Sequence, residues 1–359
     1  MKLKWPTVLL IVIAITGVAF LLGQRWIGER VFDAAVERQA GVDRSAELPD
    51  GLHAYVCGSG SPMSDAARAG PCIAVLAGRQ GFVFDSGSGS IRKLGRMGFP
   101  MDRLDAGFLT HLHSDHLDGL GELMLQAWMA GGRATPLPIY GPQGTESVVA
   151  GFMQAYDIDR GFRIAHHGPE VARPGGFGVE ARMISFADTS DDERVVYQKD
   201  GVTIRALRVD HAPVDHALAF RVEYKGRSLV ISGDTKYSPR LARFSEGADV
   251  IFHEALNPQM VGKLGSTLAA RGNSDAAKIM ADIPDYHTTP EDAARVAEAA
   301  GAKALILYHL VPAPPARLVE RAFLGDAPSL FEGTLKLSED GMLVSLPANS
   351  QGIEFDRLF

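Results

Sequence analysis

The sequence has 359 residues, of which 46% are hydrophobic and 22% are charged, and it contains 39 glycines and 20 prolines. This composition excludes a disordered or low-complexity chain and is typical of a globular enzyme rich in turns, with enough length to bury a substantial core. The formal net charge of −7 provides no overall basic field. A polyanionic partner would therefore need a local basic patch, and we find none in the sequence.

An apolar run at 8–22 follows Lys2 and Lys4 near the start of the chain. The run is close to the length of a membrane-spanning helix, which needs about 17 to 25 residues. Residues 1–25 are therefore expected to be a membrane anchor or, alternatively, a signal peptide cleaved near 17–19. Because the lysines precede the run, we expect the rest of the chain to be exported and anchored facing the periplasm or exterior, or else secreted after cleavage.

Residues 26–51 are expected to form a juxtamembrane helix and a linker that ends at Pro49-Asp50-Gly51. Cys57 and Cys72 are the only cysteines. An exported compartment would allow them to form a disulfide, but two buried cysteines on neighbouring strands fit the sequence equally well.

From residue 52 the chain changes to short apolar runs separated by glycine-rich turns, which is typical of strands. The predicted strands are 53–57, 72–76, 81–85, 106–110, 136–140, 202–209, 217–224, 228–232, 250–252, 304–308 and 335–346. Apolar residues at helical intervals predict helices at 119–130, 145–156 and 290–300. Strand-rich halves that each carry helices indicate two packed sheets with helices outside. We expect one domain at 52–346 and a C-terminal tail at 347–359.

Four potential metal ligands occupy six consecutive positions after the apolar run 104–109. At a strand end, the alternation of side chains puts His111 and His113 on the same side, and the following loop can turn Asp115 and His116 towards a second point. Imidazole nitrogens and carboxylates are ligands that zinc accepts, and sites with such donors and an open position are catalytic. The cluster therefore predicts two adjacent metal ions.

This segment resembles the His-x-His-x-Asp-His motif of the metallo-β-lactamase superfamily, and the resemblance extends over roughly 52–346. His211, Asp234 and His309 match the remaining family ligands in order. The resemblance implies an α/β fold, the four-layer αββα sandwich, and two Zn²⁺ ions, although iron or manganese also suit these donors. It implies that Asp234 bridges two ions, one held by His111, His113 and His211 and the other by Asp115, His116 and His309.

Two further segments resemble the ribonuclease Z and arylsulfatase-like branch of that superfamily, namely Phe-His-Glu-Ala at 252–255 and His-Thr-Thr at 287–289. The resemblance implies that His287 lies over the metal ions as a proton donor to the leaving group, oriented by Glu254. The expected catalytic residues are Asp115, His287 and Glu254, with Asp115 also a ligand. A side chain in the N-cap region of the helix at 290–300 is the alternative for His287.

The leading hypothesis is a zinc-dependent hydrolase that uses a metal-bridged hydroxide on a phosphodiester, sulfate or related ester of a small molecule. The first alternative is a ribonuclease Z-like tRNA 3′ endonuclease, and the second is a non-catalytic metal-binding protein on the same scaffold. Export, the negative charge and the lack of a long basic arm between 140 and 205 disfavour tRNA, so a nucleic-acid partner is expected to be unlikely. Class B β-lactamases carry a cysteine where this chain has Asp234. The sequence indicates no oligomeric state.

Overall fold

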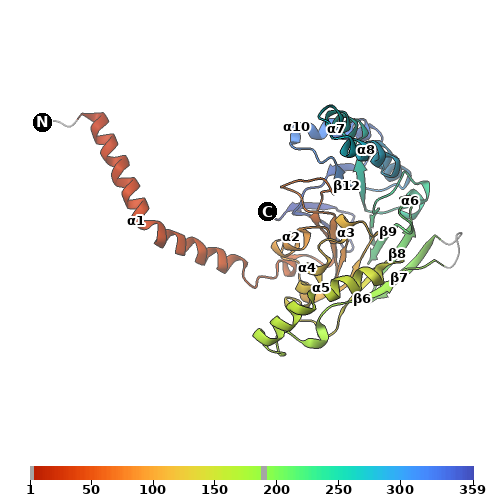
Figure 1. Ribbon diagram of the computed structural model, residues 1–359, viewed down its shortest axis with the longest axis horizontal. Coiled ribbons are helices and arrows are strands. Elements are labelled where there is room, and N and C mark those ends of the chain that lie inside the picture. Colours follow the sequence, from red (N-terminus) through yellow and green to blue (C-terminus); the bar gives the residue numbers. More distant parts are fainter. Residues whose placement is uncertain (1–3, 187–191) are drawn as a thin grey trace. The chain divides into compact units, whose positions relative to one another are not determined.

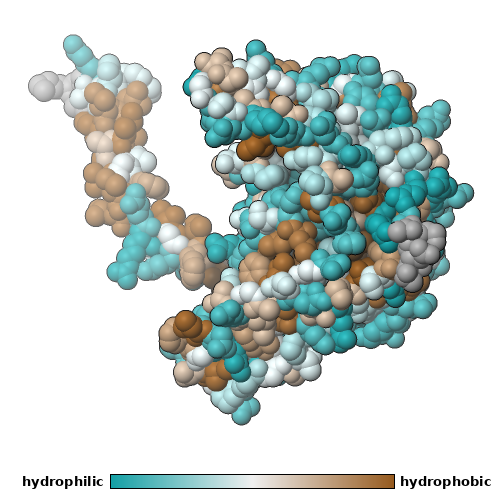
Figure 2. All heavy atoms as spheres, turned by 45° about the vertical axis from the view of Figure 1, so that its right-hand side comes forward, coloured by the Kyte–Doolittle hydropathy of each residue, from teal (hydrophilic) through white to brown (hydrophobic). Residues whose placement is uncertain are grey.

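The computed structural model describes residues 4–186 and 192–359. It divides into two compact units, Met1–Ala46 and Glu47–Phe359. In the first unit, helix α1 (Trp5–Gln39) is a single helix, so the apolar run and the expected juxtamembrane helix are continuous. Figure 2 shows hydrophobic residues along much of its surface. By length and composition α1 could cross a membrane, a test that signal sequences near an N-terminus also pass.

The second unit contains two mixed β-sheets, drawn in Figure 1. The first has the order β15-β14-β1-β2-β3-β4-β5-β6, and the second has the order β13-β12-β11-β10-β9-β8-β7. The strands of the first sheet are β1 (Gly51–Gly58), β2 (Cys72–Ala77), β3 (Gln80–Phe84), β4 (Leu104–Phe108), β5 (Leu137–Gly141), β6 (Val179–Met183), β14 (Met342–Pro347) and β15 (Glu354–Arg357). Those of the second sheet are β7 (Glu193–Lys199), β8 (Val202–Arg208), β9 (Leu218–Tyr224), β10 (Arg227–Ile231), β11 (Val250–Leu256), β12 (Ala304–Val311) and β13 (Thr334–Leu337).

Helices cover the outer face of each sheet, and a large apolar core fills the space between the sheets. Phe82 and Phe108 from the first sheet meet Phe220 from the second, with the Phe108 and Phe220 rings 5.3 Å apart. Helices α2 (Ser90–Arg96), α4 (Leu120–Met129) and α5 (Thr145–His167) pack on the first sheet. Helices α6 (Pro239–Phe244), α9 (Pro290–Ala299) and α10 (Arg317–Leu324) pack on the second sheet. This is the four-layer αββα sandwich that the sequence predicted.

The remaining helical segments lie in the connections between these strands and helices. They are η1 (Arg44–Glu47), η2 (Met101–Arg103), α3 (Ser114–Leu117), η3 (Pro174–Gly176), α7 (Pro258–Ala270), α8 (Ser274–Asp282), η4 (Ile283–Tyr286) and η5 (Ala327–Ser329). Three parallel strands of the second sheet, β10, β11 and β12, run side by side and end at one edge of it. Ligands in open α/β sheets bind at the carboxyl ends of such strands, so this edge is where a site is expected.

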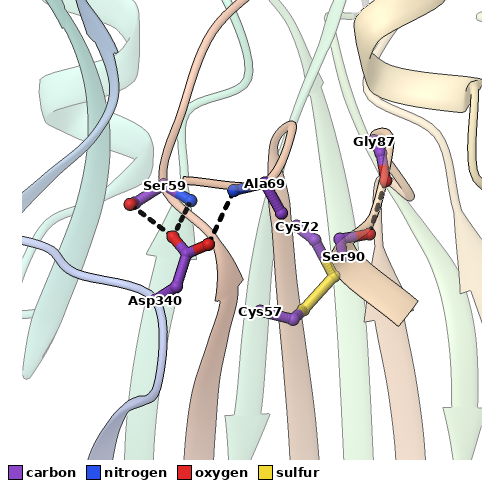
Figure 3. Close-up of a disulfide and its surroundings, with 7 residues drawn as sticks. All are labelled: Cys57, Ser59, Ala69, Cys72, Gly87, Ser90 and Asp340. Atoms are coloured by element: carbon purple, nitrogen blue, oxygen red, sulfur yellow. Dashed lines mark hydrogen bonds between the residues drawn. A yellow bond between two sulfur atoms is a disulfide. The ribbon is translucent and has the colours of Figure 1, made fainter. Parts of the chain in front are cut away.

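A disulfide joins Cys57 to Cys72 across the antiparallel pair β1 and β2, which decides the alternative that the sequence left open (Figure 3). Just beyond it, the Asp340 carboxylate accepts hydrogen bonds from the Ser59 backbone N–H at 2.9 Å and the Ala69 backbone N–H at 2.7 Å. The chain between Ser59 and Ala69, here named the β1–β2 loop, is therefore fixed at both ends. Residues of the expected tail also contribute to the fold, because β15 pairs with β14.

Candidate metal centre

The first group of candidate ligands gathers where β4 and β10 end. His111 and His113 follow β4, His211 lies in the connection from β8 to β9, and Asp234 follows β10. His113 Nδ1 lies 3.0 Å from His111 Nε2 and 3.4 Å from His211 Nε2. Asp234 Oδ2 is 3.8 Å from His111 Nε2 and 3.9 Å from His211 Nε2. One atom from each of the four side chains therefore faces a common point.

The second group lies on the other side of Asp234. Asp115 and His116 come from the single turn α3, and His309 lies near the end of β12. Asp115 Oδ2 is 3.2 Å from His309 Nε2 and 3.6 Å from His116 Nε2. Asp234 Oδ2 is 3.4 Å from both of those imidazole nitrogens. The same carboxylate oxygen of Asp234 thus borders both groups, and the fold brings all seven predicted ligands together.

The separations between these atoms fit a pair of metal ions. A tetrahedral zinc ion with Zn–N bonds of 2.0–2.1 Å requires its ligand atoms to lie about 3.3 Å apart. The side chains of His116 and Asp234 are buried, and His116 Nε2 and Asp234 Oδ1 have no hydrogen-bond partner among the described residues. Buried polar atoms are almost always paired in proteins, so such orphaned atoms indicate a missing ligand. This His and Asp cluster could therefore hold metal ions.

Residues outside the cluster fix the orientation of its imidazole rings. Asp85, just after β3, accepts a hydrogen bond from His116 Nδ1 at 2.8 Å and two from Thr110, from its backbone N–H and its hydroxyl, each at 2.8 Å. The Thr110 hydroxyl in turn accepts from His111 Nδ1 at 3.0 Å. His211 Nδ1 donates to the Tyr286 carbonyl at 2.9 Å. Because one ring nitrogen carries the donated proton, the other is left as an electron-pair donor towards the centre.

Sequence reasoning gave no role to Asp85 or to Tyr286. The signal for Asp85 was its place at the end of a buried strand, in the segment Phe-Asp-Ser-Gly at 84–87. No sequence pattern marks Tyr286, because it contributes through its backbone carbonyl.

The cluster is electrostatically coupled. Burial disfavours the charged form of Asp234, but the surrounding imidazoles, His309 and His116 above all, outweigh it and hold the pKa of Asp234 well below its usual range. Burial also opposes charge on His116, yet the carboxylates of Asp234 and Asp85 raise the pKa of His116 well above its usual value. Without metal, His116 is therefore the ligand that carries an extra proton, while burial lowers the pKa of His111, His113 and His211, and metal binding must displace that proton.

His287 and Glu254 form a pair beside this cluster. His287 Nδ1 lies 3.1 Å from Glu254 Oε1, and the same oxygen accepts the Thr288 backbone N–H at 2.9 Å. Burial lowers the pKa of His287, but the Glu254 carboxylate and then Asp234 outweigh it and raise the value to about 9. Thr289 supplies the side-chain cap of α9, so His287 is not needed there. The arrangement leaves His287 Nε2 free to donate a proton.

A cavity of about 520 Å³ opens onto the cluster. Its polar lining consists of predicted ligands, His287 and two serines. The polar lining residues are Ser64, His113, Ser114, Asp115, Asp234, His287 and His309. A small phosphoryl group together with one flanking group of a larger substrate fits a space of this size.

Residues 82–310 match the family model described as "Beta-lactamase superfamily domain". The chain is also 34% identical to the ribonuclease Z of Mycobacterium bovis over 292 residues, which is 80% of this chain and 96% of that relative. The chain belongs to the ribonuclease Z branch of the beta-lactamase superfamily. A second member of the branch, the ribonuclease Z of Mycolicibacterium paratuberculosis, is 36% identical, with 83% of this chain and all of that relative covered.

Two solved structures share the fold of this superfamily. Human tRNase Z, short form, superposes with a TM-score of 0.59 at 20% identity, covering 82% of this chain and 99% of that one. YhfI from Bacillus subtilis, a metallo-beta-lactamase fold protein, superposes with a TM-score of 0.56 at 22% identity, covering 83% of this chain and all of that one.

These relatives overturn one expectation. The sequence-based prediction of a small-molecule substrate, with a nucleic-acid partner unlikely, is wrong, because relatives that match over nearly their full length are ribonucleases. The reasoning failed because a net charge of −7 is summed over the whole chain and does not measure the local field that a phosphate meets at a metal centre. Hydrolysis of sulfate esters gains no support from these relatives.

Proposed function

We propose that this chain is a metal-dependent endoribonuclease of the ribonuclease Z type, with cleavage of a 3′-extended tRNA precursor as its defining reaction. The observation that carries the proposal is that Asp234 Oδ2 borders both ligand groups, within 3.4 to 3.9 Å of four imidazole nitrogens. A shared carboxylate between two ligand sets is what a two-metal hydrolase requires. The identity to ribonuclease Z relatives supports RNA as the substrate.

The seven side chains that we propose as ligands are His111, His113, His211, Asp115, His116, His309 and the bridging Asp234. Zinc is the metal that we propose, because the set consists of imidazole and carboxylate donors at tetrahedral spacing. When bound, two such ions supply an ionised water at neutral pH and neutralise charge on the phosphate.

The chain's own residues would perform the remaining steps. Glu254 fixes the His287 ring through its Nδ1–H, and the raised pKa of His287 keeps the ring protonated at neutral pH. His287 Nε2–H can then donate its proton to the ribose oxygen that leaves when the phosphodiester breaks. Asp115, besides being a proposed ligand, lines the cavity, where it would help to hold the attacking water.

The test is cleavage of a labelled tRNA precursor by the zinc-loaded chain, with elemental analysis of the same sample. We expect two zinc ions per chain and a cut that removes the 3′ extension. His287→Ala should retain both ions but lose activity by roughly 10²- to 10⁴-fold, because a positioned proton donor contributes about that factor. The matched control is His166→Ala, which removes an exposed histidine at the end of α5.

Two results would contradict the proposal. Metal-loaded chain that leaves the precursor and every other RNA intact would support a non-catalytic metal-binding role. Equal loss of activity in His287→Ala and His166→Ala would show that His287 has no specific role in the reaction.

A further inference from the structure

Much of the lining of the cavity beside the candidate metal centre is apolar. Three separate parts of the chain contribute to it: the β1–β2 loop, the segment from α8 to η4, and the end of β12. We name this surface the apolar wall, and its residues are Met63, Ile279, Met280, Ile283, Tyr286 and Val311. Among the described residues that line the cavity there is no lysine or arginine. The wall is therefore unsuited to additional phosphates and suited to an uncharged group attached to the phosphate at the metals.

Two sets of contacts hold the apolar wall in place. Met63, Met280 and Ile283 pack together on the buried side chains of Leu256, Val261 and Val311. On the side of the β1–β2 loop, the disulfide of Cys57 and Cys72 and the hydrogen bonds to Asp340 fix both ends of the loop that carries Met63 (Figure 3). A wall built in advance of binding loses little conformational entropy when a ligand arrives.

The composition of the wall matches a flat aromatic ring. The Tyr286 ring lies against His287, with ring centres 4.9 Å apart, so it continues the lining from the proton donor to the wall. Met63 and Met280 offer polarisable sulfur atoms, which make favourable contacts with aromatic rings. Proteins that bind single-stranded RNA commonly stack unpaired bases on such surfaces.

We propose that the apolar wall binds the nucleobase of a nucleotide that flanks the scissile phosphate. The inference rests on the proposed ribonuclease function and adds the group that the enzyme recognises beside the bond it cuts. The base has to be unpaired, because a base within a duplex has no exposed face to lay against the wall. The site would accept any of the four bases with modest preferences, since stacking uses the face of the ring rather than its edge.

The experiment compares ligands that differ only in the base. Binding of adenosine 5′-monophosphate, adenosine 3′-monophosphate and ribose 5-phosphate to the zinc-loaded full chain is measured by titration calorimetry, which needs no turnover. We expect one of the adenosine monophosphates to bind roughly 5- to 150-fold more tightly than ribose 5-phosphate, the range that stacking of one base gives.

Variants then locate the base. Ile279 is 55% exposed, so Ile279→Ser should fold normally, and it should reduce the preference for the nucleotide about fivefold. Met63→Ser tests the opposite side of the wall, with zinc content as the check on its folding. Ile158→Ser is the matched control, because Ile158 is 71% exposed on α5 and does not line the cavity.

Equal affinity for nucleotide and ribose 5-phosphate, or an unchanged preference in both Ile279→Ser and Met63→Ser, would overturn the inference. The proposed function would still hold after those results if the tRNA precursor is still cut. The proposed function itself fails if the precursor remains intact in the presence of bound zinc.

Discussion

Removing the disulfide between Cys57 and Cys72 should lower the free energy of unfolding by an amount that can be estimated from the length of the loop it closes. The bridge spans a sequence separation of 15, and the β1–β2 loop it closes is also fixed by Asp340 in the folded state. Its main effect is therefore on the unfolded chain, where closing a loop of this length removes conformational entropy worth about 3 kcal/mol. In the double variant Cys57→Ala/Cys72→Ala the lost sulfur atoms leave gaps in a fully buried region, which adds on the order of 1 kcal/mol.

The assay is urea unfolding of the metal-free full chain in detergent, oxidised and then reduced with a phosphine, with the double variant alongside. We expect the free energy of unfolding to fall by about 3 kcal/mol on reduction and by about 4 kcal/mol in the variant. Working without metal matters, since bound metal would stabilise every form and hide the difference. Agreement within about 1 kcal/mol between oxidised and reduced chain would refute the reasoning from loop entropy.

Two more predictions concern the residues that orient the centre. Asp85→Asn weakens the acceptor for His116 Nδ1, so zinc affinity, measured by competition with a chelating dye, should fall about 10- to 100-fold, and an unchanged affinity would show that Asp85 does not orient a ligand. Glu254→Gln removes the charge that raises the pKa of His287, so the basic limb of the pH–rate profile should move to lower pH, because the donor loses its proton earlier. If the basic limb of the pH–rate profile stays at the wild-type pH in Glu254→Gln, that limb reports the titration of a group other than His287.

The predicted ligands could be found from sequence because His111, His113, Asp115 and His116 crowd into one motif, and the family resemblance then assigned His211, Asp234 and His309 in order. Apolar runs also marked the strand ends near which several of these ligands lie, such as the end of β10, three residues before Asp234. The order of strands and helices likewise indicated two packed sheets. The sequence could not provide the distances between ligand atoms. It therefore could not show that one oxygen of Asp234 borders both ligand groups.

The helical hairpin α7–α8 was not predicted, and the reason bears on function. Asn257 and Asn273 accept the first backbone N–H groups of the two helices, which is a readable start signal. However, α8 buries none of its residues in the core. Its apolar side chains, Ile279 and Met280, line the cavity instead, so their spacing could not be distinguished from a surface segment. An exposed apolar side chain such as Ile279 beside a predicted metal centre was the available sign of a binding surface.

The extent of α5 was underestimated for a related reason. The helix continues to His167, whereas the apolar pattern supported it only to residue 156. Its buried residues, Thr145 and Val149, lie in the first two turns, so the second half gives no periodic signal. Gly168, with φ of +76°, follows the last helical residue, and a glycine at that position is the usual end of a helix.

The compartment in which this domain works decides which RNA it meets, and we propose that the domain is exported. Two features support this: α1 is long and apolar enough to span a membrane, and Cys57 and Cys72 form a disulfide, a bond that persists mainly in oxidising compartments. The chemistry of the cluster is the same in either compartment, so the cleavage of a tRNA precursor and the location of the domain are tested separately. Alkaline phosphatase fused after Phe359 should be active in cells, since that reporter needs an oxidising environment, and a green fluorescent protein fused there should be dark. The opposite pattern, together with free thiols at Cys57 and Cys72, would contradict export and place the domain in the cytoplasm.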